Sequence, residues 1–200
     1  MSHTMTTDGK WTNKLFKDMG AVKTPVFYIF GAVAVLSAII VCGFQWMTII
    51  TAVFLVFLAA AGSSDYNKGI VPDLIVILIA VLAVIRFFLS GISVHNALNC
   101  LAGALVLSVP MLIAALIVKK GFGGGDIKLI AAAGLFLGLE QTIVAGIITF
   151  TISGIYAVII LVTKKGGAKS AIRLAPYLAL GCAFSELFGS AFLFIFNSYI

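Results

Sequence analysis

Long apolar runs joined by short polar links are the main pattern of this chain. Seven such runs follow a polar first segment, and most are as long as the roughly 17–25 residues of a membrane-spanning helix. The pattern therefore predicts an all-α integral membrane protein, a polytopic bundle of about seven transmembrane helices. The runs are Pro25–Gly43, Trp46–Gly62, Pro72–Ser90, Asn96–Val118, Ile127–Leu139, Thr142–Thr163 and Leu174–Asn197.

The polar segment at residues 1–24 is the first of two predicted units. Its apolar residues Trp11, Leu15 and Met19 recur at helical spacing among lysines. A basic amphipathic helix of this kind lies flat on a membrane surface. We therefore expect residues 1–24 to be a cytoplasmic surface segment and residues 25–200 to be one membrane-embedded domain.

Composition excludes a soluble globular domain. Hydrophobic residues make up 62% of the 200 residues, charged residues only 10%, and the mean hydropathy is +1.20, whereas soluble domains carry about a quarter charged residues. The formal net charge of +6 would suit a nucleic-acid partner, but nearly all basic residues lie in the links between apolar runs. We therefore expect no nucleic-acid partner and a lipid bilayer as the surrounding medium.

The basic residues lie on one side of the predicted bundle. Twelve of the thirteen belong to the first segment or to the alternate links 63–71, 119–128 and 164–173. The other links and the C-terminus carry none, and Arg86 alone lies inside an apolar run. The positive-inside rule then places the N-terminus in the cytoplasm and the C-terminus outside.

Neither a metal nor a cofactor is expected. Cys42, Cys100 and Cys182 are scattered within apolar runs, and His3 and His95 are isolated. Their spacing matches neither a zinc site nor a disulfide framework. The glycine-rich stretch before the fifth run also lacks the Gly-Lys-Ser/Thr ending of a phosphate-binding loop.

The most distinctive polar stretch is KKGFGGGDIKLI, Lys119–Ile130, between the fourth and fifth runs. Its glycines tolerate positive φ and close backbone approach, which favours a tight, irregular turn in front of Asp126. On the same predicted side, Asp65 follows the second run in GSSDYNKGIVPD. Two close carboxylates share a proton, so one can activate water while the other serves the developing oxyanion. We hypothesise that Asp65 and Asp126 form such a dyad, with base and acid unassigned.

Each of these charged residues also has a structural interpretation. Asp65 fits a solvated position in a polar loop, and Asp126 fits the N-cap of the fifth helix. Asp73, directly after Pro72, fits a first-turn residue that the helix dipole stabilises. Lys128 fits an interfacial lysine whose charge reaches water.

The fifth run is too short to span a bilayer. From Asp126 to Glu140 a helix rises roughly 21 Å, against a hydrocarbon core of about 30 Å. If Glu140 marks the outer interface, Asp126 lies several ångströms below the inner one. Irregular backbone at that depth is tolerated only in a wet cavity or within protein, so we expect the glycine stretch to line a water-accessible pocket.

Arg86 and Glu186 are charged residues within apolar runs, where an ionisable group is costly and usually paired or functional. Counted from the cytoplasmic ends of their helices, they lie at similar depths of roughly 21 and 18 Å. An interhelical ion pair is therefore a candidate. The alternative is that Arg86 snorkels outward while Glu186 is protonated or faces a polar groove.

Three motifs of the chain occur together in one known family. They are Gly123-x-Gly125-Asp126 followed by DIKLIAAAGLFLG, the turn Val71-Pro72-Asp73 after Asp65, and Pro176-Tyr177-Leu178-Ala179-Leu180-Gly181. With these motifs the chain resembles the prepilin peptidases (type IV leader peptidases), which are GxGD intramembrane aspartyl proteases, over roughly residues 30–195. The resemblance implies that Asp65 and Asp126 are catalytic, with Gly123, Gly125, Pro72 and Lys128 shaping the site.

The resemblance further implies a membrane aspartyl endopeptidase that needs no cofactor. Its substrates would be type IV prepilins or related pseudopilin and flagellin-like precursors, whose basic leader is cut at the cytoplasmic membrane border. The protein would be a multi-pass component of a prokaryotic plasma membrane, with its active site facing the cytoplasm. Longer members carry a cytoplasmic domain with two CxxC pairs and also methylate the new N-terminus. Because this chain has no CxxC, methyltransferase activity is in doubt.

Two other functions remain open at this point. Presenilin-like and signal-peptide-peptidase-like proteases share the GxGD motif, but their first motif is Tyr-Asp within a helix, whereas here Asp65 precedes Tyr66. A small ion-coupled transporter would need acidic residues near the bilayer midplane, and only Glu186 meets that condition. The oligomeric state is not predicted.

Overall fold

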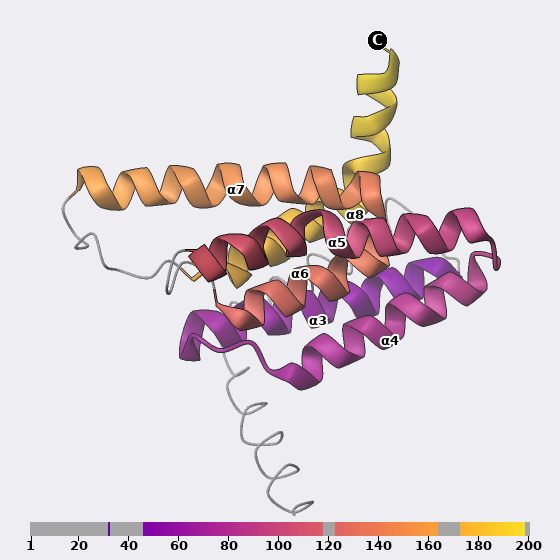
Figure 1. The fold of residues 1–200 in the computed structure, drawn as a ribbon, viewed down its shortest axis with the longest axis horizontal. Helices are drawn as coiled ribbons and strands as arrows, with labels where there is room; N and C mark the ends of the chain where they lie inside the picture. The colour runs from indigo at the N-terminus through magenta and orange to yellow at the C-terminus, as the bar shows by residue number, and fades with distance from the viewer. Residues whose placement is uncertain (1–31, 33–45, 118–122, 164–172, 199–200) are drawn as a thin grey trace, which may run out of the picture.

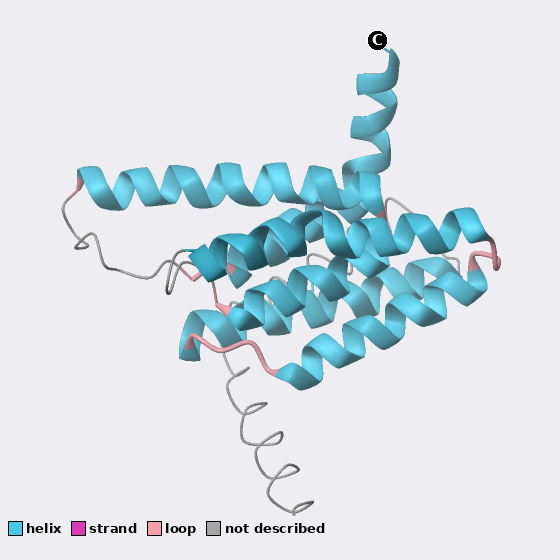
Figure 2. Cartoon of the chain, in the orientation of Figure 1, coloured by secondary structure: helices cyan, strands magenta, loops and turns pink. Residues whose placement is uncertain are grey.

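The computed structural model describes residues 32, 46–117, 123–163 and 173–198, and every regular element within them is a helix (Figure 1, Figure 2). The amphipathic segment 1–24 and, apart from residue 32, the first apolar run lie outside these residues. The helices are α3 (Trp46–Lys68), α4 (Asp73–Leu89), α5 (Val94–Ile117), α6 (Gly124–Leu137), α7 (Leu139–Val162) and α8 (Ala175–Ser198).

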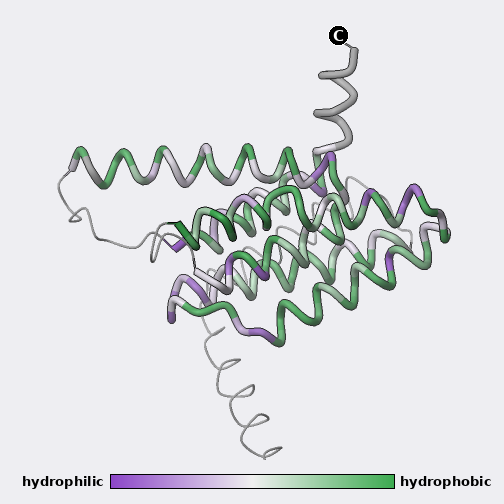
Figure 3. Tube along the Cα trace, in the orientation of Figure 1, coloured by the Kyte–Doolittle hydropathy of each residue, from purple (hydrophilic) through white to green (hydrophobic). Residues whose placement is uncertain are grey.

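Among the described helices, three are long and apolar enough to cross a membrane: Met47–Lys68, Val94–Ile117 and Leu139–Ile160. Apolar positions run along the helices, and hydrophilic ones gather towards their ends (Figure 3). Large apolar side chains such as Leu105 on α5 and Ile147 on α7 stay exposed. An extended exposed apolar surface is foreign to soluble monomers and suits contact with lipid. The predicted all-α class is thus confirmed for the described residues.

The core lies around α3 and α6. Phe54 of α3 stacks on Phe136 of α6, with ring centroids 3.9 Å apart and 10° between the ring planes. Leu58 of α3, Leu129 of α6 and Leu178 of α8 are buried in the same cluster. In Figure 1 the C-terminal end of α3 and the N-terminal end of α6 lie on the same side of the bundle. The two helices that carry the candidate aspartates therefore pack against each other in the core.

Two glycines bring α5 and α6 into backbone contact. A Cβ atom added at Gly134 would lie 2.8 Å from the carbonyl carbon of Gly103, and closer still to its oxygen. A Cβ added at Gly103 would meet the backbone of Gly134 and Gly138 in the same way. Small residues at such a crossing let membrane helices pack by van der Waals contact. Any side chain larger than hydrogen at Gly134 would push the two helices apart.

Helix α3 is longer than the second apolar run. The run was predicted to end at Gly62, whereas α3 continues to Lys68. The next residue, Gly69, has a φ of 66°. The extra turns carry buried Ser64 and Asp65, so tertiary contacts keep them helical where hydropathy indicated a loop. Glycine at Gly69 adopts the left-handed conformation that commonly terminates a helix. The predicted loop position of Asp65 is therefore wrong.

Only Gly138 separates α6 from α7, whereas a link at Glu140–Gln141 was predicted. The φ of Gly138 is 81°, a conformation that favours glycine. Asn99 of α5 stabilises this junction, because its side-chain oxygen accepts a hydrogen bond of 3.0 Å from the backbone N–H of Leu139. Glu140 thus lies in the first turn of α7.

Candidate active site

Asp65 lies in the last turns of α3 and is almost completely buried. Its carboxylate faces the positive charge of Arg173 and the backbone N–H of Ala175, the first residue of α8. Oδ2 is buried and has no hydrogen-bond partner within the described part of the chain. Of the earlier interpretations, the solvated loop residue is excluded, because this carboxylate is enclosed between α3 and the start of α8.

Arg173 is held against the end of α3. Its Nη1 donates a hydrogen bond to the backbone carbonyl of Tyr66, and its Nε lies 3.7 Å from the place that a Cβ on Gly69 would occupy. The guanidinium therefore caps the carbonyl end of α3, where the helix dipole also favours a cation. The same contact keeps the charge of Arg173 beside Asp65.

Asp126 lies in the first turn of α6, outside the three candidate spans. The N-cap of α6 is Gly123, so the alternative interpretation of Asp126 as an N-cap is wrong. Its backbone N–H donates to the Gly123 carbonyl at 3.1 Å, and its side chain is buried. Burial raises the pKa of the Asp126 carboxyl to about 6; the Asp65 carboxylate also raises this pKa, whereas the backbone N–H of Gly123 opposes the rise.

The two motif glycines make room for neighbouring groups. Gly123 has φ −72° and ψ 136°, which any residue adopts, so the tolerance of glycine for positive φ is not used at this position. A Cβ on Gly123 would lie 3.1 Å from Oδ2 of Asp126, and one on Gly125 would lie 3.1 Å from Cβ of Val71. Gly125 therefore admits the Val71–Pro72 turn beside the carboxylate. Close approach, the second property expected of these glycines, accounts for both positions.

Asp73 and Lys128 form an ion pair next to this turn. Nζ of Lys128 lies 2.9 Å from Oδ1 of Asp73, and both side chains are more than half exposed. Pro72 is the N-cap of α4, and Asp73 lies in its first turn as predicted. Exposed pairs of this type contribute about 0–1 kcal/mol. The pair links α4 to α6, and the charge of Lys128 is directed to Asp73.

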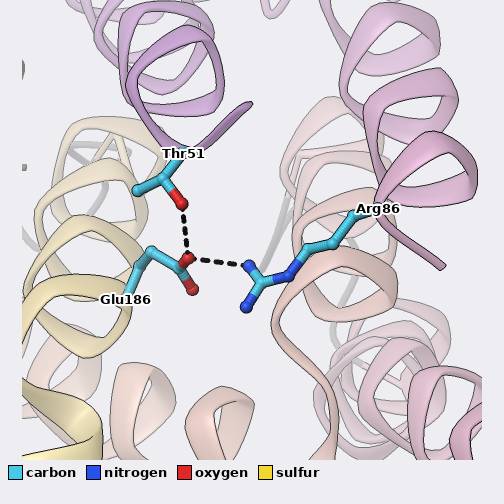
Figure 4. A network of polar contacts seen from close by, with 3 residues as sticks. All are labelled: Thr51, Arg86 and Glu186. Carbon is cyan, nitrogen blue, oxygen red and sulfur yellow. Dashed lines mark hydrogen bonds and ion pairs between the residues drawn. The ribbon is translucent and has the colours of Figure 1, made fainter. Parts of the chain in front are cut away.

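Arg86 and Glu186 form the interhelical ion pair that their depths indicated. Nη1 of Arg86 lies 2.7 Å from Oε1 of Glu186, and Thr51 of α3 donates to the same oxygen at 2.9 Å (Figure 4). The snorkelling alternative for Arg86 is therefore wrong. The pair joins α4 to α8, and Thr51, its hydrogen-bond partner on α3, lies about four turns of that helix away from Asp65.

Within residues 46–117, 123–163 and 173–198, no three His, Cys, Asp or Glu side chains lie close enough together to hold a metal ion. Two carboxylates within electrostatic range, both buried and both at helix ends, are the chemically distinctive feature of this part of the chain. Two carboxyls whose charges interact lose their protons in separate steps, and such a pair suits acid–base hydrolysis.

Comparison with known proteins agrees with this geometry. A family model described as the type IV leader peptidase family matches residues 52–158, more than half of the chain. The chain belongs to the type IV leader peptidase family. The match includes both Asp65 and Asp126. The prepilin leader peptidase/N-methyltransferase of Bacillus subtilis (strain 168) is similar, with 28% identity over 141 residues.

The aligned region covers 70% of this chain and 55% of the Bacillus protein, so the chain spans about half the length of this curated relative of the type IV leader peptidase family. No solved structure matches the chain. Two residues near the aspartates, Arg173 and Ala175, were missed in the sequence, whereas Val71 was named only as part of the turn Val71-Pro72-Asp73. In the sequence, Arg173 is one of several basic residues in the link 164–173. Its position beside Asp65 depends on how α8 packs against α3.

Proposed function

We propose that this chain is a membrane aspartyl endopeptidase that cleaves the basic leader from type IV prepilins or related pseudopilin and flagellin-like precursors. The observation that carries the proposal is the buried Asp126 carboxyl, whose pKa the Asp65 carboxylate raises further. Membership of the type IV leader peptidase family and the name of the Bacillus relative support the substrate class. The two aspartates are the proposed catalytic residues.

The surroundings of the two carboxyls assign a role to each. Burial disfavours the ionised form of both carboxyls. At Asp65 a guanidinium and a backbone N–H oppose this effect. Asp126 has one backbone N–H and faces the negative charge of Asp65, and both burial and that charge favour its protonated form. Because Asp65 has more groups that favour its charge than Asp126 has, Asp65 is the general base and Asp126 the general acid in our proposal. Arg173 is a positioning residue whose charge favours ionised Asp65 against the effect of burial.

The reaction then needs no group beyond water and the two carboxyls. Water bound between them gives one proton to Asp65 as its oxygen bonds to the scissile carbonyl carbon, and Asp126 protonates the carbonyl oxygen. The tetrahedral diol then collapses: the carbon–nitrogen bond breaks, the nitrogen takes the proton held by Asp65, and one hydroxyl returns its proton to Asp126. The products are a free carboxyl on the leader and a free amine on the mature protein.

We further propose that the chain is a multi-pass protein of a prokaryotic plasma membrane with about seven spans, residues 1–24 on the cytoplasmic surface and residues 25–200 in the bilayer. The one-sided distribution of basic residues supports a cytoplasmic N-terminus and an outward C-terminus. Under this topology the C-terminal end of α3 and the N-terminal end of α6 face the cytoplasm. That is also the side on which a basic leader would stay when its hydrophobic helix enters the membrane.

Co-expression with a prepilin-like substrate tests the proposal directly. Replacing Asp126 or Asp65 by Ala should lower leader cleavage by about 10³-fold or more, because each removes one of the two proton-transfer groups. Glu140→Ala is the matched control: Glu140 is an exposed carboxylate in the first turn of α7 and should leave cleavage unchanged. Cleavage at the wild-type rate by a properly inserted Asp126→Ala protein would refute the proposed function.

A further inference from the structure

One buried carboxylate joins four helices at the end of the bundle opposite the aspartates. Glu186 of α8 accepts a hydrogen bond from Thr51 of α3 and forms an ion pair with Arg86 of α4 (Figure 4). With its amide nitrogen turned towards these acceptors, Gln141 of α7 donates to Oε2 of Glu186 at 3.1 Å and to the Leu137 carbonyl at 3.2 Å. Both oxygens of Glu186 are thus engaged.

Arg86 extends this network to the fifth helix, α6. Its guanidinium carbon lies 4.4 Å from the ring centroid of Phe136, a cation–π contact. The other partner of that ring is Phe54 of α3. The contacts therefore form a closed circuit from α3 through α8, α4 and α6 back to α3.

Stability alone is a poor reason for such a network. Burying two charges costs several kcal/mol of desolvation each, and an apolar replacement of the same volume is often as stable as the pair or more so. What hydrogen-bonded charges add is a defined geometry, because their distances and directions are restricted. Glu186 is buried, with a side-chain exposure of 5%, so this geometric constraint acts where water competes little.

Apolar packing is incomplete around this network. Two cavities of about 160 and 260 Å³ lie beside Arg86, which lines both of them together with Ser90, whereas Glu186 lines only the larger one. The larger one is also lined by Thr48, Thr51 and Gln141. Neither cavity reaches Asp65 or Asp126. Beside these cavities, the polar contacts of Glu186 and Arg86 and the stacking of Phe54 on Phe136 hold the helices together at this end.

The network acts on the same two rigid helices that carry the aspartates. Thr51 precedes Asp65 on α3 by roughly 21 Å of helix, and Phe136 follows Asp126 on α6 by roughly 15 Å. A shift or rotation of α3 against α6 at the network is carried along each helix to its aspartate. A displacement of about 1 Å at the reacting groups can cost about 10²-fold in rate.

We propose that Glu186 and Arg86 are positioning residues that set the register of α3 against α6, and through it the spacing of Asp65 and Asp126. This inference rests on the proposed function for its kinetic consequences. Its structural part, that the network controls the spacing between two helix ends, does not rest on the proposed function.

A distance measurement tests this structural part independently of cleavage. In protein whose native cysteines are replaced by Ala, spin labels at positions 66 and 124 report on α3 and α6, because Tyr66 is 68% exposed and Gly124 has open space around it. Glu186→Gln keeps the shape and removes the charge. We expect a narrow distance distribution for the labelled parent, and a broadened or shifted one for Glu186→Gln. Glu140→Gln is the matched control, with no change expected.

The kinetic arm uses the same variants without labels. Glu186→Gln should lower kcat by about 10- to 100-fold with little change in KM, and should move the descending high-pH limb of the rate profile to lower pH as the aspartates separate. The double variant Arg86→Gln/Glu186→Gln, which restores a neutral hydrogen-bonding pair, should recover part of the loss. If Glu186→Gln does not fold, Thr51→Val is a milder second variant. Its control is Thr151→Val, because the Thr151 side chain is exposed.

The outcomes separate the two proposals. Unchanged label distances together with a wild-type kcat and pH profile in folded Glu186→Gln or Thr51→Val would overturn the positioning role, even if those variants melt at lower temperature. If instead the wild-type protein cleaves no prepilin-like substrate, the proposed function fails while the label distances still decide whether the network sets the helix register.

Discussion

Gly124 and Gly125 are neighbours in the sequence, yet their surroundings differ. A Cβ on Gly124 would meet nothing within 4 Å, whereas one on Gly125 would lie 3.1 Å from Val71. Gly125→Ala should therefore displace the Val71–Pro72 turn or the first turn of α6 and lower cleavage about 10-fold or more. Gly124→Ala should keep the wild-type rate. Equal rates for the two variants, measured on the same prepilin-like substrate, would show that the close approach to Val71 has no catalytic effect.

The ionisation of Asp126 gives a second residue-scale prediction. Its pKa is raised from 3.8 to about 6 in the folded protein, so between those values the folded state holds more protons than the unfolded state. The Asp126 contribution to stability is therefore fully present at low pH and is lost as pH rises through about 6. Asp126→Asn removes this dependence. The apparent Tm of the variant in detergent, minus that of the wild type, should therefore increase from pH 4 to pH 7.

The matched comparison for that experiment is Asp73→Asn, because the Asp73 side chain is exposed. Its apparent Tm should follow the wild type across the same range. A difference between wild type and Asp126→Asn that stays constant from pH 4 to pH 7 would contradict the raised pKa of Asp126.

At the level of residues, the sequence was sufficient to find the aspartates and insufficient to find their neighbours. The glycine motif and the shared side of the membrane singled out Asp65 and Asp126. The contact of Arg173 with the end of α3 depends on the packing of α8, which no local pattern encodes. The pair of Arg86 and Glu186 was foreseeable because a charge at one depth in a bundle needs an opposite charge at a similar depth.

The crossing of α5 and α6 gives a prediction at the scale of elements. Gly134→Ala places a methyl group against the backbone of Gly103, so it should destabilise the protein by about 1–3 kcal/mol through overpacking. Gly154→Ala on α7 meets nothing within 4 Å, and it should be neutral or stabilising by up to about 1 kcal/mol from helix propensity. Unfolding in detergent titrations compares the two, and a Gly134→Ala protein as stable as Gly154→Ala would show that the helices can separate without cost.

Helices were predictable as elements, whereas their ends were not. Long apolar runs predict helices because the backbone must satisfy its hydrogen bonds internally in lipid. Polar Ser64 and Asp65 looked like the start of a loop, but both are buried and helical. Likewise Glu140 looked like an outer link, although Gly138 alone makes the turn between α6 and α7. In each case tertiary packing, which hydropathy does not describe, decided the boundary.

The proposed membrane orientation gives a prediction at the scale of the whole molecule. In protein without native cysteines, a cysteine at Ser93, in the link before α5, should react with a membrane-impermeant maleimide in intact cells. A cysteine at Lys68, at the end of α3, should react only after permeabilisation. Reaction of both from outside, or reversal of the two, would contradict the topology drawn from the basic residues.

Partners of α3 lie far later in the sequence, on and just before α8. Thr51 bonds to Glu186 across 135 residues, and Asp65 faces Arg173 and Ala175 at the start of α8. During translation α3 is therefore made long before the helix that encloses its carboxylate. The proposed pair of Asp65 and Asp126 therefore stays incomplete until α8 has been synthesised and has packed against α3.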